Sequence, residues 1–216
     1  MPGPSRNYAK ELERLIQKLQ QEGKVPRLLL HACCAPCSSA VLEYLSQYFA
    51  ITLLYYNPNI APLEEYQKRE AELRRLVSQM KFTHPVELLP CQYDGQAFVQ
   101  AARGLEGEPE GGKRCEACFR LRLRYAAQEA ARLHFDYYTT TLSISPMKNA
   151  PLLNQLGEEI GREFGVAHLP SDFKKKDGYK RSVQLSKEYD LYRQDYCGCA
   201  FSKAQRQREK EERKEV

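Results

Sequence analysis

The stretch His31-Ala32-Cys33-Cys34-Ala35-Pro36-Cys37 follows directly on the apolar run Leu28-Leu29-Leu30 and places three thiols within five residues. The apolar run predicts a short buried strand, and Pro36 with the two serines after Cys37 predicts the start of a helix. The thiols therefore lie on a strand-to-helix turn, which in α/β proteins is the carboxyl edge of the sheet, where ligands bind. The amino terminus of a helix also favours thiolate over thiol, and thiolate is the form that binds metal.

Outside this turn, apolar segments of strand length alternate with segments of helical periodicity. Strands are expected at 25–31, 51–56, 86–89, 137–142 and 166–169, and helices at 8–21, 38–49, after Pro62, and at 96–103, 119–133, 149–164 and 183–194. Residues 104–113 are rich in Gly, Glu and Pro and predict a mobile loop. The alternation predicts an α/β fold, a Rossmann-like, mostly parallel sheet with helices on both faces.

The composition is that of one large globular domain, with or without an extension, because the chain has 216 residues of which 42% are hydrophobic and 28% charged. No apolar stretch approaches the roughly 20 residues that a membrane span requires. The first residues lead into a charged helix and not into an apolar signal segment, so we expect a cytoplasmic protein that has no contact with a membrane. The formal charge of +5 permits nucleic acid as a partner without requiring it.

Seven of the eight cysteines fall into three tight groups, and only Cys91 stands apart. In a reducing compartment such groups indicate metal or redox chemistry in preference to structural disulfides. Besides the first stretch, the groups are a CxxC at Cys115 and Cys118 and a CxC at Cys197 and Cys199. We expect Cys91 to be an ordinary half-buried thiol.

Soft thiolates select zinc, copper(I) or an iron–sulfur cluster. The CxxC suits a zinc knuckle or a 4Fe–4S cluster, whereas the adjacent pair Cys33-Cys34 does not suit a knuckle, which needs two intervening residues. The favoured ligand set for a 4Fe–4S cluster is therefore Cys33, Cys34, Cys115 and Cys118. A zinc-stabilised fold without catalysis remains the alternative.

Three thiols are left over by this set. Cys197 and Cys199 can close a small, strained disulfide that is readily reduced. Alternatively, Cys37, Cys197 and Cys199 can hold a second metal beside the cluster.

Several longer motifs, in order along the chain, resemble the cobalamin-independent epoxyqueuosine reductase family, QueH. They are HACCAPCS at 31–38, YYNPNI at 55–60 with Glu65, Tyr66 and Arg69, RCEACFRLRL at 114–123, TTTLSISP at 139–146, DFKK at 172–175 and YRQDYCGC at 192–199. The resemblance covers about residues 25–202. It divides the chain into an N-terminal helix at 1–24, a reductase domain at 25–202 and a charged helical tail at 203–216.

The resemblance implies an oxidoreductase that converts epoxyqueuosine to queuosine in the anticodon loop of transfer RNA, the last step of queuosine synthesis. It implies that Cys33, Cys34, Cys115 and Cys118 bind a 4Fe–4S cluster, with the iron–sulfur site at the carboxyl edge of the strands. It also implies that the CxC is a redox-active pair. Some relatives carry Asp at the position of Cys37. Because Asp and Cys can both ligate iron, a second, mononuclear iron held by Cys37, Cys197 and Cys199 remains an alternative. The reaction requires an external electron donor of unknown identity.

Removing the epoxide oxygen as water takes two electrons and two protons, whereas one 4Fe–4S cluster passes a single electron at a time. The CxC dithiol or a second iron would complete the pair, and a second iron could also polarise the epoxide oxygen. The candidate proton donors are His31, Asp172, Asp195, Tyr55 and Tyr56. A structural, hydrogen-bonded role is the alternative for His31. The two tyrosines either belong to the core or stack on a flipped-out base.

Basic residues precede the CxC and follow the CxxC. The cluster Lys174, Lys175, Lys176, Lys180 and Arg181, together with Arg120, Arg122 and Arg124, is expected to bind transfer-RNA phosphates. The alternative for each is a solvated surface position. The charged tail after residue 202 is expected to be a solvated helix.

Two other classes of function remain open. One is an ATP-dependent RNA-modifying enzyme of the PP-loop type, although the turn at 31–37 has thiols where that class has a Ser-Gly-Gly phosphate cradle. The other is a zinc-stabilised module that binds RNA without catalysis.

Overall fold

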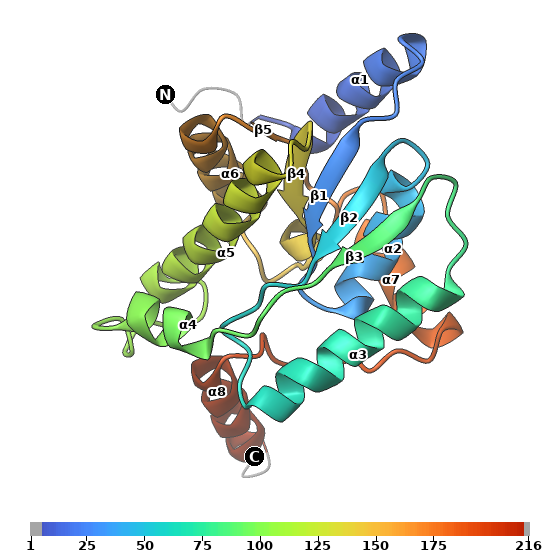
Figure 1. Cartoon of the computed structure of the whole chain (residues 1–216). Helices are drawn as coiled ribbons and strands as arrows, with labels where there is room; N and C mark the ends of the chain where they lie inside the picture. Colours follow the sequence, from blue (N-terminus) through green and yellow to red (C-terminus); the bar gives the residue numbers. More distant parts are fainter. Residues whose placement is uncertain (1–5, 214–216) are drawn as a thin grey trace.

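Five parallel strands form one sheet in the computed structural model, which describes residues 6–213 (Figure 1). The sheet order is β3-β2-β1-β4-β5, and all four neighbouring pairs are parallel. The strands are β1 (Arg27–His31), β2 (Ala50–Leu54), β3 (Val86–Leu89), β4 (Tyr137–Thr140) and β5 (Ala167–His168). This confirms the predicted parallel α/β sheet.

Helices connect the strands and cover the sheet. They are α1 (Tyr8–Gln21), α2 (Ala35–Leu45), α3 (Leu63–Gln79), α4 (Gly95–Ala102), α5 (Lys113–Arg132), the 3-10 turn η1 (Thr141–Ile144), α6 (Ala150–Phe164), α7 (Gly178–Glu188) and α8 (Ala200–Glu212). Among the described helices, none is long and apolar enough to cross a membrane.

The two faces of the sheet have separate cores because side chains alternate along each strand. In β1, Leu28 and Leu30 pack with α1, α2, α3 and α7, whereas Leu29 packs with α5 and α6 on the other face. Figure 1 shows these two sets of helices on opposite sides of the strands. The predicted helices on both faces are thereby confirmed.

The strand order reverses at β1, since the chain first proceeds through β2 and β3 on one side and then crosses to β4 on the other. The connections after β1 and β4 consequently leave the sheet in different directions and open a crevice at its carboxyl edge. Residues 32–34 follow β1, and η1 follows β4 at this point. The first thiol stretch thus lies at the topological switch point.

Several predicted boundaries were wrong by a few residues. The helix α2 begins at Ala35 with Pro36 in its first turn, so Cys37 is already helical. The helix α5 begins at Lys113 and contains the CxxC, whereas the prediction placed its start at 119. The helix predicted at 183–194 is α7 at Gly178–Glu188, because Asp177 with φ 59° sets its start and Asp190 with φ 48° follows its end.

The strand expected at 137–142 also ends early. The Thr140 hydroxyl accepts a hydrogen bond from the Leu142 backbone N–H and caps η1, so the chain turns away after β4. Helix α1 is part of the main core, since Leu12, Ile16 and Leu19 pack with the sheet. The described part of the tail forms α8, as expected, and its last three residues, 214–216, lie outside the described range.

Candidate active site

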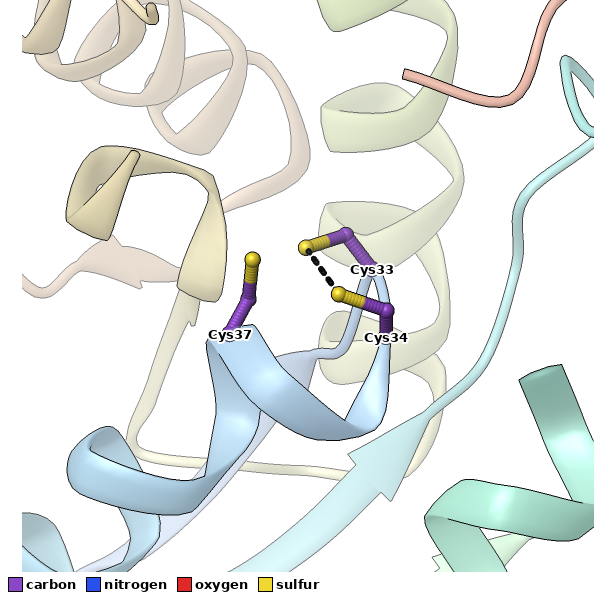
Figure 2. Close-up of side chains that lie close together, drawn as sticks. All are labelled: Cys33, Cys34 and Cys37. Carbon is purple, nitrogen blue, oxygen red and sulfur yellow. Dashed lines mark hydrogen bonds between the residues drawn. The ribbon is translucent and has the colours of Figure 1, made fainter. Parts of the chain in front are cut away.

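Three sulfur atoms meet at the amino terminus of α2. The Sγ atoms of Cys33, Cys34 and Cys37 all lie within 4.8 Å of one another, and those of Cys33 and Cys34 are 3.9 Å apart. Figure 2 shows Cys33 and Cys34 on the turn after β1 and Cys37 on α2, with their thiols directed into one space. We call these residues the thiol triad.

The triad is arranged to hold negative charge. Hydrogen bonds from Cys33 and Cys37 lower the pKa of Cys34 well below its usual range. The same contacts raise the pKa of Cys37, and the hydrogen bond with Cys34 raises the pKa of Cys33 to about 11. These contacts favour the thiolate form at Cys34 and the thiol form at Cys33 and Cys37, and a bound metal ion would ionise the other two thiols.

The turn η1, which follows β4 on the other side of the switch point, contributes to this geometry. The Thr141 hydroxyl accepts a hydrogen bond from the Cys33 backbone N–H at 3.2 Å and donates one to the Cys33 Sγ at 3.3 Å. Thr141 is the first residue of η1, the turn that follows β4. Its hydroxyl therefore fixes the Cys33 sulfur at the crevice between β1 and β4.

The other four clustered thiols line a second, small cavity, together with Asn59, Phe98, Arg114, Phe119 and Arg122. Cys115 and Cys118 come from the first turns of α5, and Cys199 is the N-cap residue of α8. Burial raises the pKa of Cys118 to about 12. The Cys199 Sγ accepts a hydrogen bond of 3.4 Å from the Ser202 backbone N–H.

A larger cavity of about 650 Å³ is lined by the thiol triad and by Cys197. The two cavities share four lining residues, namely Glu110, Arg122, Cys197 and Ser202. Seven thiols, from β1–α2, α5 and the segment before α8, thus border two adjacent cavities. The structure brings all three sequence groups to these cavities, and among residues 6–213 only the thiol triad has three sulfurs that lie within 4.8 Å of one another.

Buried polar atoms without hydrogen-bond partners are concentrated around these cavities. Seven residues within 6–213 contain such atoms, and six of them line one cavity or the other: Asn57, Asn59, Arg69, Arg114, Arg122 and Gln194. Buried polar groups in native proteins are nearly always paired, and exceptions require an explanation. A polar or charged occupant of the cavities provides one, so the donor set and its surroundings fit a thiolate-bound metal group.

The CxC is held in place by a buried arginine. Arg69 donates a hydrogen bond from Nη1 to the Cys197 carbonyl at 3.2 Å and forms an ion pair with Glu65 at 2.7 Å. Gly198 has φ +120°, and a Cβ there would lie 2.9 Å from Ile60 and 3.0 Å from the Arg69 guanidinium. Only glycine adopts this backbone without strain, which explains the residue between the two cysteines.

A second polar network reaches the CxC from the loop at 104–113. Lys148 forms an ion pair of 2.9 Å with Glu110, whose other oxygen accepts a 2.9 Å hydrogen bond from the Ser202 hydroxyl. The Ser202 hydroxyl in turn accepts from the Cys197 backbone N–H at 3.1 Å. Although burial opposes it, the neighbouring Cys197 and the Glu110 carboxylate raise the pKa of Lys148, so this cation is retained. The loop that was predicted to be mobile is therefore tied to the site.

His31 and the two tyrosines are structural in this arrangement. His31 is completely buried, and its ring nitrogens contact the Thr140 hydroxyl at 2.8 Å and the Tyr56 carbonyl at 2.9 Å. Burial lowers the pKa of His31 to about 4. Tyr55 hydrogen-bonds to Tyr66 in the core, and Tyr56 stacks on Tyr125 with ring centroids 3.8 Å apart. Neither tyrosine ring is available to stack on a base.

The two aspartates predicted as candidate proton donors, Asp172 and Asp195, lie in different cavities. Asp195 lines the large cavity and is paired with Lys210, which lowers its pKa. Asp172 lines a third cavity, between α1, α2 and α7, and is paired with Lys174 at 2.9 Å. The thiol cavities are formed without it.

The basic residues differ in availability. Lys176 pairs with Glu13 and Arg181 with Glu43, whereas Lys175 and Lys180 are exposed and have no ion pair within the described residues. On α5, Arg120 and Arg124 pair with Glu159 and Glu163 on the surface. Arg122 is only 1% exposed, so the expected phosphate contact by this residue is wrong. Cys91 is half-buried and outside the thiol cavities, as expected.

Sequence reasoning missed Glu110, Lys148, Asn57, Asn59 and Ser202 as parts of the site. Asn57 and Asn59 belong to the motif at 55–60, to which no role in the site was assigned, although residues at the carboxyl end of a strand are well placed for a ligand site. Glu110 and Lys148 lie in irregular segments, where no periodicity shows which side chains turn inward.

Comparison with known proteins agrees with this geometry. The sequence model of one family, described as Epoxyqueuosine reductase QueH, matches residues 28–205. The chain is 42% identical to the Epoxyqueuosine reductase QueH of Streptococcus pyogenes serotype M1, over 93% of this chain and 80% of that protein. It is 42% identical to the protein of the same name from Staphylococcus epidermidis, over 91% and 84%. The corresponding protein of Thermotoga maritima is 35% identical over 83% and 91%.

Proposed function

The chain belongs to the epoxyqueuosine reductase QueH family, and we propose that it reduces epoxyqueuosine to queuosine in transfer RNA. The observation that carries the proposal is the convergence of seven thiols on two cavities at the switch point of the sheet. The larger cavity, of about 650 Å³, has the size of a small-molecule site and can admit a single modified nucleoside.

We assign Cys33, Cys34, Cys115 and Cys118 as the ligands of a 4Fe–4S cluster. The assignment is supported by Arg122, which lines the large cavity together with Cys33 and the small cavity together with Cys115 and Cys118. When bound, such a cluster supplies single electrons. The unpaired N–H groups of Arg69, Arg114 and Arg122 around both cavities are suited to an anionic metal group.

We assign the CxC as the second redox group. Oxidation of Cys197 and Cys199 to a disulfide releases two electrons and two protons, which balance the conversion of the epoxide to an alkene and water. The alternative assignment gives Cys37 and the CxC a second, mononuclear iron, and the position of Cys197 on both cavities is compatible with either. Regeneration requires an external reductant.

The part of the chain that carries this function is proposed to be 25–202, with 1–24 and 203–216 as additions. We place the protein in the cytoplasm, where transfer RNA is its substrate. The exposed Lys175, which precedes α7, and Lys180, in the first turn of α7, provide cationic contacts for RNA phosphates.

Metal analysis and turnover test this function together. Anaerobically reconstituted protein is expected to contain about four irons and four sulfides per chain, with a broad brown absorption. Incubation with a chemical reductant and epoxyqueuosine-containing transfer RNA is expected to yield queuosine, measured by mass spectrometry of the digested nucleosides. A fifth iron without further sulfide would favour the mononuclear iron over the dithiol. Zinc without sulfide, and no queuosine, would contradict the proposal and favour the zinc-stabilised RNA-binding module.

A further inference from the structure

Arg122 is a buried cation without a carboxylate partner among residues 6–213. Its side chain is 1% exposed, its Nε donates a single 3.3 Å hydrogen bond to the Cys118 carbonyl, and its Nη2 has no partner. The two other buried arginines differ, because Arg69 is paired with Glu65 and Arg114 donates to three backbone carbonyls.

The position of Arg122 follows from the helical repeat of α5. Residues 115, 118 and 122 are separated by three and four positions, so they lie on one face of the helix. This face borders the small cavity, and Arg122 lines the large cavity as well. The thiols that share these cavities with its guanidinium are Cys33 on the large one, Cys115 and Cys118 on the small one, and Cys197 on both.

An unpaired charge in a protein interior carries a large desolvation penalty, and buried charges are therefore paired or bound to a metal group. The weak contacts of Arg122, including the Phe119 ring at 5.7 Å from its guanidinium carbon, do not supply a counter-charge. Thiolates that ligate a metal ion or an iron–sulfur core carry net negative charge, and Cys33, Cys115, Cys118 and Cys197 line the same cavities as Arg122. The Glu110 carboxylate also lines both cavities, but it is paired with Lys148. The cation and the loaded site thus complete each other.

We propose that Arg122 is a positioning residue that neutralises the thiolate-bound metal group and makes its reduced state accessible. The inference rests on the proposed function for the identity of the cluster, but the counter-charge role applies to any thiolate-bound metal. A fixed positive charge beside a redox group stabilises the form with one more electron. Removing that charge is expected to lower the reduction potential and to weaken metal retention.

The test compares Arg122→Gln, which removes the charge, with Arg122→Lys, which keeps it. Arg120→Gln is the matched control, because it removes a cation from the exposed face of the same helix, where Arg120 pairs with Glu159. Circular dichroism and thermal unfolding select the variants that fold. The reduction potential is then measured by spectroelectrochemistry on the reconstituted protein.

The expected result for Arg122→Gln is at least a tenfold smaller equilibrium constant for reduction, which for one electron corresponds to a potential about 59 mV lower. Arg122→Lys and Arg120→Gln are expected to stay within threefold of the wild type. Equal potentials for wild type and Arg122→Gln would overturn the inference. If Arg122→Gln fails to fold, Arg122→Met and Arg122→Lys provide the same comparison of uncharged and charged side chains.

A second readout separates this inference from the proposed function. Protein loaded with Zn²⁺ alone is mixed with a chelator, and the rate of zinc release is followed. Arg122→Gln is expected to release zinc at least tenfold faster than the wild type, with Arg122→Lys in between. If the wild type holds only zinc and no iron–sulfur cluster, the proposed function fails and the counter-charge role is judged by this rate. Equal rates for the wild type and Arg122→Gln would overturn that role.

Discussion

The Thr141 hydroxyl lies 3.3 Å from the Cys33 Sγ and joins the turns that follow β4 and β1, the two strands at which the sheet order reverses. Parallel strands on either side of a switch point usually form a ligand crevice through their loops. Here the Thr141 hydroxyl accepts a hydrogen bond from the Cys33 backbone N–H and donates one to the Cys33 Sγ. It therefore fixes both the backbone of the turn after β1 and the position of the Cys33 sulfur.

Replacing Thr141 with Val is expected to reduce iron occupancy without unfolding the protein. The substitution keeps the shape of the side chain and removes two hydrogen bonds, which costs about 1–3 kcal/mol of unfolding free energy. Thr139→Val is the control, because Thr139 is equally buried but donates to the Leu169 carbonyl. Urea unfolding and iron analysis of both variants are the measurements. Equal iron contents in the two variants would show that the Thr141–Cys33 contact does not contribute to the site.

Replacing Cys199 with Ser is expected to leave about four irons and four sulfides per chain and to abolish queuosine formation. The reason is that the proposed cluster ligands remain, whereas the dithiol can no longer form a disulfide. Cys91→Ser is the control, since Cys91 lies outside both thiol cavities. Turnover is measured by nucleoside mass spectrometry. An active Cys199→Ser variant would remove the CxC from the reaction.

The stability of the protein is expected to fall as the pH falls below about 6.5, in part because of His168. Its ring packs over Gly157 and against Tyr138, neither ring nitrogen has a hydrogen-bond partner, and burial lowers its pKa to about 4. The negative charge of Glu158 raises the pKa of His168, but this effect is smaller than that of burial. Between pH 6.5 and 4 the unfolded chain binds the proton that the folded chain excludes, so the contribution is present above 6.5 and lost as the pH falls toward 4.

The measurement is urea unfolding of wild type and His168→Gln at pH 7.5 and pH 5. One titrating group contributes at most about 1.4 kcal/mol per pH unit, and the loss of unfolding free energy is expected to be about 1–2 kcal/mol smaller in the variant. If the unfolding free energies of wild type and His168→Gln fall equally between pH 7.5 and pH 5, His168 has the same pKa in the folded and unfolded chain, and the prediction is wrong.

Replacing both Lys175 and Lys180 with Ala is expected to weaken transfer-RNA binding and to reduce its dependence on salt. Each lysine that contacts a phosphate releases counterions, so losing two contacts lowers the slope of log affinity against log salt by about 1.4–1.8. Lys81→Ala is the control, because this exposed lysine lies between α3 and β3, outside the basic segment at 174–181. Fluorescence anisotropy across a salt series provides the slope. A slope equal to that of the wild type would exclude these two lysines from the RNA interface.

The sequence was sufficient to predict the parallel sheet and the place of the first thiol stretch, because both depend on local patterns. Apolar runs such as Leu28-Leu29-Leu30 indicate buried strands, and Pro36 indicates a helix start. The alternation of strands and helices then predicts which edge of the sheet carries the thiols. The ligand set and the redox role of the CxC stay predictions.

The polar surroundings of the thiols could not be predicted in the same way. Arg122 stands in a segment with Arg120 and Arg124 that resembles a basic surface, and only the helical phase with Cys115 and Cys118 turns it inward. Glu110 and Lys148 meet at 2.9 Å from two irregular segments, and this pairing depends on the tertiary fold alone. Likewise, a lysine in a basic run does not reveal whether a carboxylate from another helix neutralises it, as Glu13 does for Lys176.

The distribution of the thiols along the chain has a consequence for biosynthesis. Cys33 and Cys34 emerge early from the ribosome, whereas Cys197 and Cys199 follow only after every strand of the sheet has been translated. Until then the large cavity lacks Cys197 and Ser202 from its lining, and Arg69 lacks the Cys197 carbonyl to which it donates. A metal group of the kind proposed above would therefore meet an incomplete site during translation, and its insertion is expected after the last segment has been released and docked.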